Sequence, residues 1–422
     1  MTERDLSPPQ PREPDKVVLK RSLPLSYATL YGLGVTIGAG IYVLVGAAAA
    51  RAGMHAPLAF VLAAVLMALS AASFAELAGR FPVAAGEAAY AREAFHSDVL
   101  ATAVGALVVA IAIVSAAAIS VGSAGYLAVF LPLPAPVLIA AVVLTMGAIA
   151  CLGVKESVSF AAVMTIIEIG GLVILVLAGF TSGTEIVTRL PEVVPRAANP
   201  AAFVGLMSAT LLAVFAFVGF EGLANVAEEV RDPERNLPRA IFLTLAVSTL
   251  LYVLVVWISL VTVGPADLAR STAPLALVFE RLTGASPGTM SLIALVATLN
   301  GIIVQTIMSS RVLYGLGRQG NLPAAFGSVN QATRTPMFAT VFTMALVLLL
   351  ALALHLHDLA DVTSRLTLVV FAIVNMSLAR IKQRDPRRPP GIYVAPTWVP
   401  WAGAAACIAL LAGDWAAEWL RP

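Results

Sequence analysis

The chain has 422 residues, of which 59% are hydrophobic and 12% charged, and its formal net charge is +2. An ordinary soluble protein carries about 25% charged residues, so this composition indicates a protein whose solvent is a lipid bilayer. The small net charge and the dispersed basic residues exclude a nucleic-acid-binding protein. Cys151 and Cys407 lie in apolar stretches, where a free thiol packs as a small hydrophobe, so we expect no disulfide, metal site or cofactor.

Residues 1–21 are polar and proline-rich, and they lack the apolar core and cleavage site of a signal peptide. We therefore expect an N-terminal tail. Beyond it, apolar runs separated by charged or proline- and glycine-rich segments predict about eleven membrane-spanning helices. In chain order these are 25–50, 57–79, 99–130, 135–152, 159–180, 201–227, 240–263, 288–314, 337–354, 359–381 and 398–412.

The basic residues are distributed unevenly over this predicted topology. With the N-terminus in the cytoplasm, most of the 26 Lys and Arg residues lie in the inner segments. Positively charged loops remain on the cytoplasmic side of membrane proteins. The sequence therefore predicts a multi-pass protein of the cell (cytoplasmic) membrane with a cytoplasmic N-terminus.

Spans one to five and six to ten can be arranged as two similar units. Because each unit has an odd number of spans, the second is inverted relative to the first, and glycines interrupt both first spans, as in inverted-repeat transporters. We expect a tail at 1–21, a first repeat at 22–182 and an extracytoplasmic linker at 183–200. A second repeat at 201–382 and a final loop with the eleventh span at 383–422 follow.

The first span contains four glycines within nine residues, at 32, 34, 38 and 40. Each costs about 1 kcal/mol relative to Ala in a helix interior, so something must offset them. One interpretation is an unwound segment that lines a cavity and binds a substrate through its backbone. The other is close helix packing, because Gly34 and Gly38 form a pair of small residues one turn apart. The glycines alone leave both interpretations open.

Several charged residues allow more than one interpretation. Glu221 follows Gly219 at the end of the sixth span, where a carboxylate is either functional or solvated because the helix ends early. Glu87 and Arg92 could form an inner gate or be solvated loop charges. In the tenth span, the charged side chains near one end can reach the membrane interface.

Four stretches occur in an order that is typical of one transporter family. They are residues 34–42 (GVTIGAGIY), 81–90 (FPVAAGEAAY), 217–221 (FVGFE) with 228–238 (EEVRDPERNLP), and 310–314 (SRVLY) with 320–323 (GNLP). The chain resembles permeases of the amino acid–polyamine–organocation superfamily, in the branch of basic or cationic amino acid permeases. This resemblance implies an all-α integral membrane protein with the LeuT-type 5+5 inverted repeat and broken first and sixth helices.

The resemblance also implies where a substrate binds. The α-carboxylate would meet backbone amides in the first break and the α-ammonium would meet carbonyls in the second, while Phe215 would be an aromatic gate. Half-helix ends favour such a zwitterion, because an N-terminus attracts an anion and a C-terminus a cation. The implied substrate-binding residues are Thr36, Ile37, Gly38, Ala39, Gly40, Phe215, Ala216, Phe217, Val218 and Gly219.

Glu168 is the only charged residue between Glu156 and Glu185, and it lies about 18 Å along the helix from Glu156. A carboxylate at that depth suggests a functional site. In the proton-coupled permeases that the chain resembles, this position is a lysine whose ammonium replaces a sodium ion. We expect Glu168 to face the first helix and Asn300, and to exchange a proton or hold a cation, with Glu221 as a further coupling candidate. The alternative is a protonated acid that only hydrogen-bonds the bundle.

Together these features predict a secondary-active transporter of amino acids or related amines that works by alternating access, either proton-coupled or as an exchanger. A sodium-coupled symporter is the alternative, and a channel or sensor is a weaker one, since the sequence shows no repeated filter segments. An enzyme is not expected, because no nucleophile, base or metal cluster converges. The expected partners are an amino acid, H⁺ or Na⁺, and the lipid bilayer.

Overall fold

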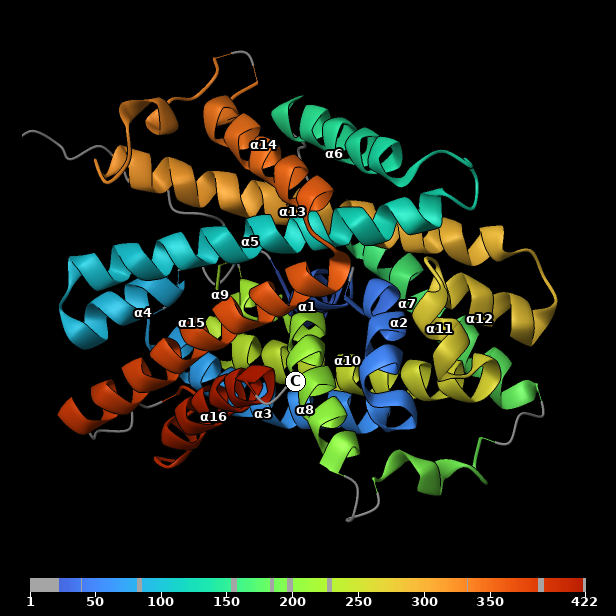
Figure 1. The fold of residues 1–422 in the computed structure, drawn as a ribbon. Coiled ribbons are helices and arrows are strands. Elements are labelled where there is room, and N and C mark those ends of the chain that lie inside the picture. The colour runs from blue at the N-terminus through green and yellow to red at the C-terminus, as the bar shows by residue number, and fades with distance from the viewer. Residues whose placement is uncertain are drawn as a thin grey trace, which may run out of the picture.

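The computed structural model describes residues 23–38, 40–81, 86–152, 158–182, 186–195, 200–225, 230–331, 333–385 and 391–419 (Figure 1). Within these residues the fold is almost entirely helical, and the β structure is one isolated bridge between Leu23 and Val230. The α-helices are α1 (Leu25–Ile37), α2 (Gly40–Ala52), α3 (Ala56–Arg80), α4 (Gly86–Phe95), α5 (Asp98–Leu127), α6 (Ala135–Leu152), α7 (Val158–Thr181), α8 (Pro200–Phe217), α9 (Gly222–Asn225), α10 (Pro233–Val263), α11 (Pro265–Arg270), α12 (Pro274–Thr283), α13 (Pro287–Arg318), α14 (Met337–Ala353), α15 (Leu356–Arg384) and α16 (Val399–Trp419). The short 3₁₀ helices are η1 (Gly53–His55), η2 (Leu190–Val193) and η3 (Ala324–Gly327).

The described helices have the length and composition of membrane spans. Eight helical stretches are long and apolar enough to cross a membrane, and three shorter apolar helices, 25–37, 337–353 and 399–415, accompany them. Large apolar side chains such as Val65, Leu144 and Leu250 are more than half exposed on the outside, as expected where lipid replaces water. The predicted all-α membrane protein is confirmed.

Each predicted span coincides with a helix or a helix pair of the described chain. The first span corresponds to α1 and α2, and the sixth to α8 and α9. The sequence missed α4, α11 and α12, which lie outside the long apolar runs. It also placed the start of the seventh span too late, because α10 begins at Pro233, where a proline fits the first helical turn.

The two broken spans occupy the centre of the bundle. In Figure 1, α1 and α2 lie between the crossing pair α5 (cyan) and α13 (orange) on one side and α3, α8 and α10 on the other. One continuous apolar core joins residues from all of these helices. The two breaks are therefore held on several sides by long, unbroken helices.

Buried polar groups also tie α3 to α15. Asn375 on α15 accepts a hydrogen bond from Ser73 and donates one to Ser70, at 2.6 and 2.9 Å. Further along, the fully buried Glu76 carboxylate accepts hydrogen bonds from Lys382 Nζ (2.5 Å) and from the backbone N–H of Ala395 (2.8 Å). Buried charges are paired in this way because an unpaired one is costly in a low-dielectric interior.

Candidate functional site

The two helix breaks face each other at the centre of the molecule. α1 ends at Ile37 and α2 begins at Gly40, while α8 ends at Phe217 and α9 begins at Gly222 after a turn. A Cβ atom at Gly40 would lie 2.6 Å from the Cα atom of Ala216, closer than real Cβ contacts allow. The second half of the first span is therefore packed directly against the backbone of the sixth.

Gly219 adopts a conformation that other residues rarely adopt. Its φ is +132°, and a Cβ atom there would lie 2.7 Å from the carbonyl oxygen of Val35 and 3.0 Å from the Cα atom of Thr36. Both the dihedral angle and the close approach require glycine. By contrast, Gly34 lies in intact helix, where a Cβ would meet Thr165 on α7 at 2.1 Å. Close packing thus accounts for Gly34, whereas Gly40 and Gly219 shape the breaks.

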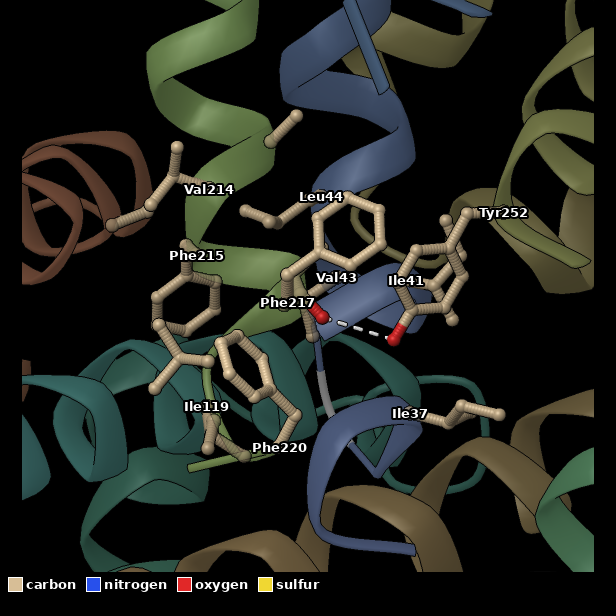
Figure 2. Packing of buried hydrophobic residues seen from close by; sticks show 14 of the residues in the cluster. Ile37, Ile41, Val43, Leu44, Ile119, Val214, Phe215, Phe217, Phe220 and Tyr252 are labelled. Atoms are coloured by element: carbon tan, nitrogen blue, oxygen red, sulfur yellow. Dashed lines mark hydrogen bonds between the residues drawn. The ribbon is translucent and has the colours of Figure 1, made fainter. Parts of the chain in front are cut away.

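Tyr252 on α10 joins the two breaks. Its hydroxyl lies 2.9 Å from the carbonyl oxygens of both Thr36 and Ala216 and can donate to either. These carbonyls belong to the last turns of α1 and α8. In a continuous helix they would accept hydrogen bonds from amides one turn further along the chain, but here the helices end. The ring is fully buried and packs against Phe217, with ring centroids 5.2 Å apart (Figure 2).

A small cavity of about 20 Å³ lies at the breaks. Its volume is comparable to the space that one water molecule needs. No charged side chain is among its lining residues, which are Val35, Thr36, Gly40, Ser115, Ile119, Phe215, Val218, Gly301, Val304 and Gln305. Two of its polar atoms, Thr36 Oγ1 and Gln305 Oε1, are buried without a hydrogen-bond partner among the described residues.

A larger cavity of about 480 Å³ adjoins the small one and shares Val35, Val304 and Gln305 with it. It extends to Arg92 on α4, whose side chain is 51% exposed, and it therefore reaches the surface. Arg311 on α13 also lines it. The larger cavity therefore lies between the breaks and one side of the molecule, and its lining is partly charged.

Two carboxylates line this larger cavity, of which Glu87 is buried and Glu221 half-buried. Glu221 lies in the turn between α8 and α9, where its Oε2 accepts a hydrogen bond of 2.8 Å from the N–H of Gly219. Glu87 on α4 is 4% exposed, and this burial raises its pKa to about 7. The two carboxylates are close enough to interact electrostatically. Glu87 is therefore not a solvated loop charge, which was one of the two interpretations of the sequence.

At the opposite side of the molecule, a partly buried ion pair connects α2, α8 and α15. The guanidinium of Arg51, at the end of α2, donates two hydrogen bonds of 2.7 Å to the carboxylate of Asp361 on α15. The same guanidinium donates to the backbone oxygen of Ser208 on α8 at 3.1 Å. Asp361 is one of the charged side chains near the end of the tenth span for which the sequence predicted a place at the interface, and it is paired with Arg51 across the bundle.

Glu168 on α7 is fully buried beside the first break. Its Oε1 accepts a hydrogen bond of 3.2 Å from Asn300 Nδ2 on α13, and its backbone oxygen accepts one of 2.6 Å from the hydroxyl of Tyr42 on α2. Tyr126 on α5 donates in turn to the backbone oxygen of Tyr42 at 2.5 Å. Glu168 Oε2 is buried and has no partner among the described residues.

The predicted substrate-binding residues do not share one environment. Phe215 lies beside Ile119 and lines the small cavity, whereas Phe217 lies on the side of Tyr252 and Ile37 packs in the core (Figure 2). Two of the predicted ammonium acceptors already have donors, since Val218 N–H donates to the carbonyl of Phe215 at 3.2 Å and Tyr252 bonds Ala216. A carbonyl has two lone pairs and can accept again. Ala39 lies outside the described residues.

Sequence reasoning missed three residues of the site: Tyr252, Ser115 and Gln305. Each lies in a long apolar helix that carries several other polar residues, so no pattern in the sequence distinguishes it from its polar neighbours. Among the described residues, no group of three or more His, Cys, Asp or Glu side chains is placed to hold a metal ion.

Comparison with known proteins agrees with this architecture. The chain is 29% identical over 407 residues to the branched-chain amino acid permease BcaP of Bacillus subtilis, which covers 90% of this chain and 85% of that protein. It is 31% identical over 408 residues to an uncharacterized transporter of Mycobacterium tuberculosis, covering 96% and 88% of the two chains. It is also 29% identical over 395 residues to the vacuolar cationic amino acid transporter 2 of Arabidopsis thaliana, covering 88% of this chain but only 61% of that longer protein. The amino acid permease family model matches residues 25–413, and the chain belongs to this family.

Proposed function

We propose that this chain is a secondary-active transporter that carries small neutral amino acids across the cytoplasmic membrane by alternating access. The observation that carries the proposal is the pair of facing helix breaks around a cavity without a charged side chain. A cationic substrate would need a buried counter-charge, because an unpaired charge in a dry site is costly. Membership of the amino acid permease family supports an amino acid as the substrate.

The half-helix ends supply the groups that every amino acid needs. The N-terminus of α2 at Gly40 presents unpaired amides and a partial positive charge, which suit the α-carboxylate. The C-terminal end of α8 presents carbonyls, which suit the α-ammonium. The backbone therefore binds the part that all amino acids share, and the remaining walls select the side chain.

The two sides of the molecule differ as the two gates of an alternating-access cycle do. The Arg51–Asp361 pair closes one side, and the cavity of about 480 Å³ opens the other. The excess of basic residues in the predicted inner segments supports a cytoplasmic N-terminus, which places α4 and the cavity on the cytoplasmic side. The conformation is then inward-facing, and the inverted repeat of spans one to five and six to ten is the device that interconverts it with an outward-facing form.

We assign the coupling of transport to Glu168. Its Oε2 has no donor among the described residues, although its Oε1 is held by Asn300. A proton on Oε2 removes the buried charge of the carboxylate, which a low-dielectric interior disfavours, and release of that proton leaves a charge beside the first break. Transport coupled to an inward proton gradient follows from that change. Glu221 lies on the cavity wall and is the candidate for passing the proton to the cytoplasm.

The test is uptake of labelled L-alanine into proteoliposomes that contain the purified chain. We expect accumulation above equilibrium with an acidic exterior, a smaller signal without the gradient, and no accumulation of L-lysine. Accumulation that requires a sodium gradient and ignores pH would identify the sodium-coupled alternative instead. If neither gradient drives uptake of alanine, the proposed function is wrong.

Glu168→Gln tests the coupling assignment, because glutamine keeps the shape and the Asn300 contact but does not titrate. We expect this variant to equilibrate alanine but to lose accumulation driven by the proton gradient. The matched control is Glu280→Gln, which removes an exposed carboxylate on α12 and should leave accumulation unchanged. Full pH-driven accumulation by Glu168→Gln would show that Glu168 is structural.

A further inference from the structure

Gln305 is the polar side chain at the junction of the two cavities. It lies on α13, is 6% exposed, and lines both the small cavity at the breaks and the larger cavity beyond it. Its Oε1 atom is buried and has no hydrogen-bond partner among the described residues. Such atoms are rare in folded proteins, because a buried acceptor without a donor loses its hydration and gains nothing in return.

Among the described residues, nothing that lines the small cavity bonds Gln305 Oε1. On α5 and α13 the wall consists of Ser115, Ile119, Gly301 and Val304, and Ser115 is the one polar side chain of these four. Thr36, which lines the same cavity, also has a buried hydroxyl, Oγ1, without a partner among the described residues. Two unsatisfied polar groups around one space indicate that its ligand is polar there and not purely aliphatic.

The backbone ends of α2 and α8 account for the carboxylate and ammonium of a substrate, so α5 and α13 remain to contact its side chain. An amide both donates and accepts hydrogen bonds, and either orientation of Gln305 can therefore bond a hydroxyl. The small volume disfavours long side chains, and the absence of charge among the lining residues disfavours ionic ones. A short side chain with a hydroxyl fits all three conditions.

We propose that Gln305 is a specificity-determining residue that hydrogen-bonds the side-chain hydroxyl of the substrate, so that serine and threonine are preferred to apolar amino acids of the same size. This inference rests on the proposed function and names the substrate class within it. An apolar side chain in the same place leaves Gln305 unsatisfied, and the discrimination comes from that penalty.

L-Threonine and L-valine provide the test, because they have nearly the same shape and differ by a hydroxyl in place of a methyl group. In proteoliposomes containing the full chain, we expect kcat/KM for threonine to exceed that for valine by about tenfold, the size of one neutral hydrogen bond. In Gln305→Met, which keeps the length of the side chain, we expect the ratio to fall to about one. The control Gln331→Met makes the same change at an exposed loop residue and should keep the parental ratio.

Binding supplies a second readout if the methionine variant does not transport. Threonine should raise the melting temperature of the purified parent more than valine does, and this difference should vanish in Gln305→Met. Equal handling of threonine and valine by the parent, with alanine transported, overturns this inference and leaves the proposed function intact. A threonine preference that survives in Gln305→Met also overturns it. Failure to transport alanine, threonine and valine alike overturns the proposed function, and this inference with it.

Discussion

The two sides of the central site are built differently. On one side, Arg51 and Asp361 form a two-pronged ion pair between α2 and α15, with side chains only 16% and 20% exposed. On the other, Glu87, Arg92 and Arg311 line a cavity of about 480 Å³. Opposite charges in contact close the first side, whereas the second keeps charged side chains around an open space. If these two sides are the gates of the proposed transport cycle, then its gates are not mirror images of each other.

The closed side depends on a contact that includes a broken helix. Arg51 lies at the end of α2, the second half of the first span, and also bonds the backbone of α8 at Ser208. Paired guanidinium and carboxylate groups in this geometry are stronger than ordinary exposed ion pairs. A movement of α2 relative to α15 must break this contact, whereas the cavity side can change shape without losing an ion pair of this kind.

The largest expected effect comes from blocking the point where the two sides meet. Gly40→Leu places a side chain where even a Cβ atom would lie 2.6 Å from Ala216 Cα, so the breaks cannot keep their contact. We expect complete loss of alanine binding and transport with normal membrane insertion. The control Gly413→Leu adds the same side chain on α16, where a Cβ atom would meet nothing within 4 Å. Alanine binding by Gly40→Leu at parental affinity would contradict the placement of the substrate at the breaks.

A moderate effect is expected from opening the closed side. Asp361→Asn removes the charge that holds Arg51, so the outward-facing form should become more populated, by about tenfold for a partly buried pair. The reporter is Ser208→Cys in a chain whose Cys151 and Cys407 are replaced by serine. A larger outward-facing population should increase the rate at which a membrane-impermeant maleimide labels position 208. Asp414→Asn is the matched control, because it weakens the comparable Arg365–Asp414 pair, which joins α15 to α16. Equal labelling rates in the two variants would show that the Arg51 pair does not act as a gate.

The smallest effect concerns Glu87 on the open side. Burial raises its pKa to about 7, so the folded chain binds the proton more tightly than the unfolded chain, whose glutamate titrates near 4.3. This tighter proton binding stabilises the folded chain fully below a pH of about 4.3. Its stabilising contribution declines as the pH rises and is lost above a pH of about 7. Glu87→Gln should therefore match the parent at pH 4.5 and melt a few degrees higher at pH 8. Glu93→Gln, at an exposed carboxylate on the same helix, is the control. A constant difference between Glu87→Gln and the parent across this pH range would contradict the assignment.

Hydropathy predicted the membrane-spanning helices well, because the bilayer requires long uncharged helical runs whatever the tertiary contacts are. The short helices α4, α11 and α12 were missed for the complementary reason. They have at most ten residues each and contain charged residues such as Glu87, Asp267 and Glu280, and their helical state depends on packing against the bundle. The family resemblance was confirmed by the family model, because each of its motifs is a short contiguous stretch that can be read without knowledge of the fold.

The site was only partly predictable for a related reason. Glycines 38, 40 and 219 mark the breaks because unwinding leaves a local trace in the sequence. Tyr252 and Gln305 leave none, since each is one of several polar residues in its helix and only the tertiary contacts distinguish it. The Arg51–Asp361 pair joins residues that are 310 positions apart, and no local pattern indicates such a partner. Contacts that are distant in sequence were thus the part that required the structure.

The Tyr252 hydroxyl has a further consequence for the empty carrier. A transporter that returns without cargo must carry its own unfilled binding groups through the low-dielectric centre of the membrane, where each orphaned carbonyl costs several kcal/mol. Here the carbonyls of Thr36 and Ala216 have a phenol within 2.9 Å, which can bond to them while no ligand is present. Because the phenol has one O–H, it can donate to one of the two carbonyls at a time, and we expect it to lower part of the desolvation cost of the unloaded protein.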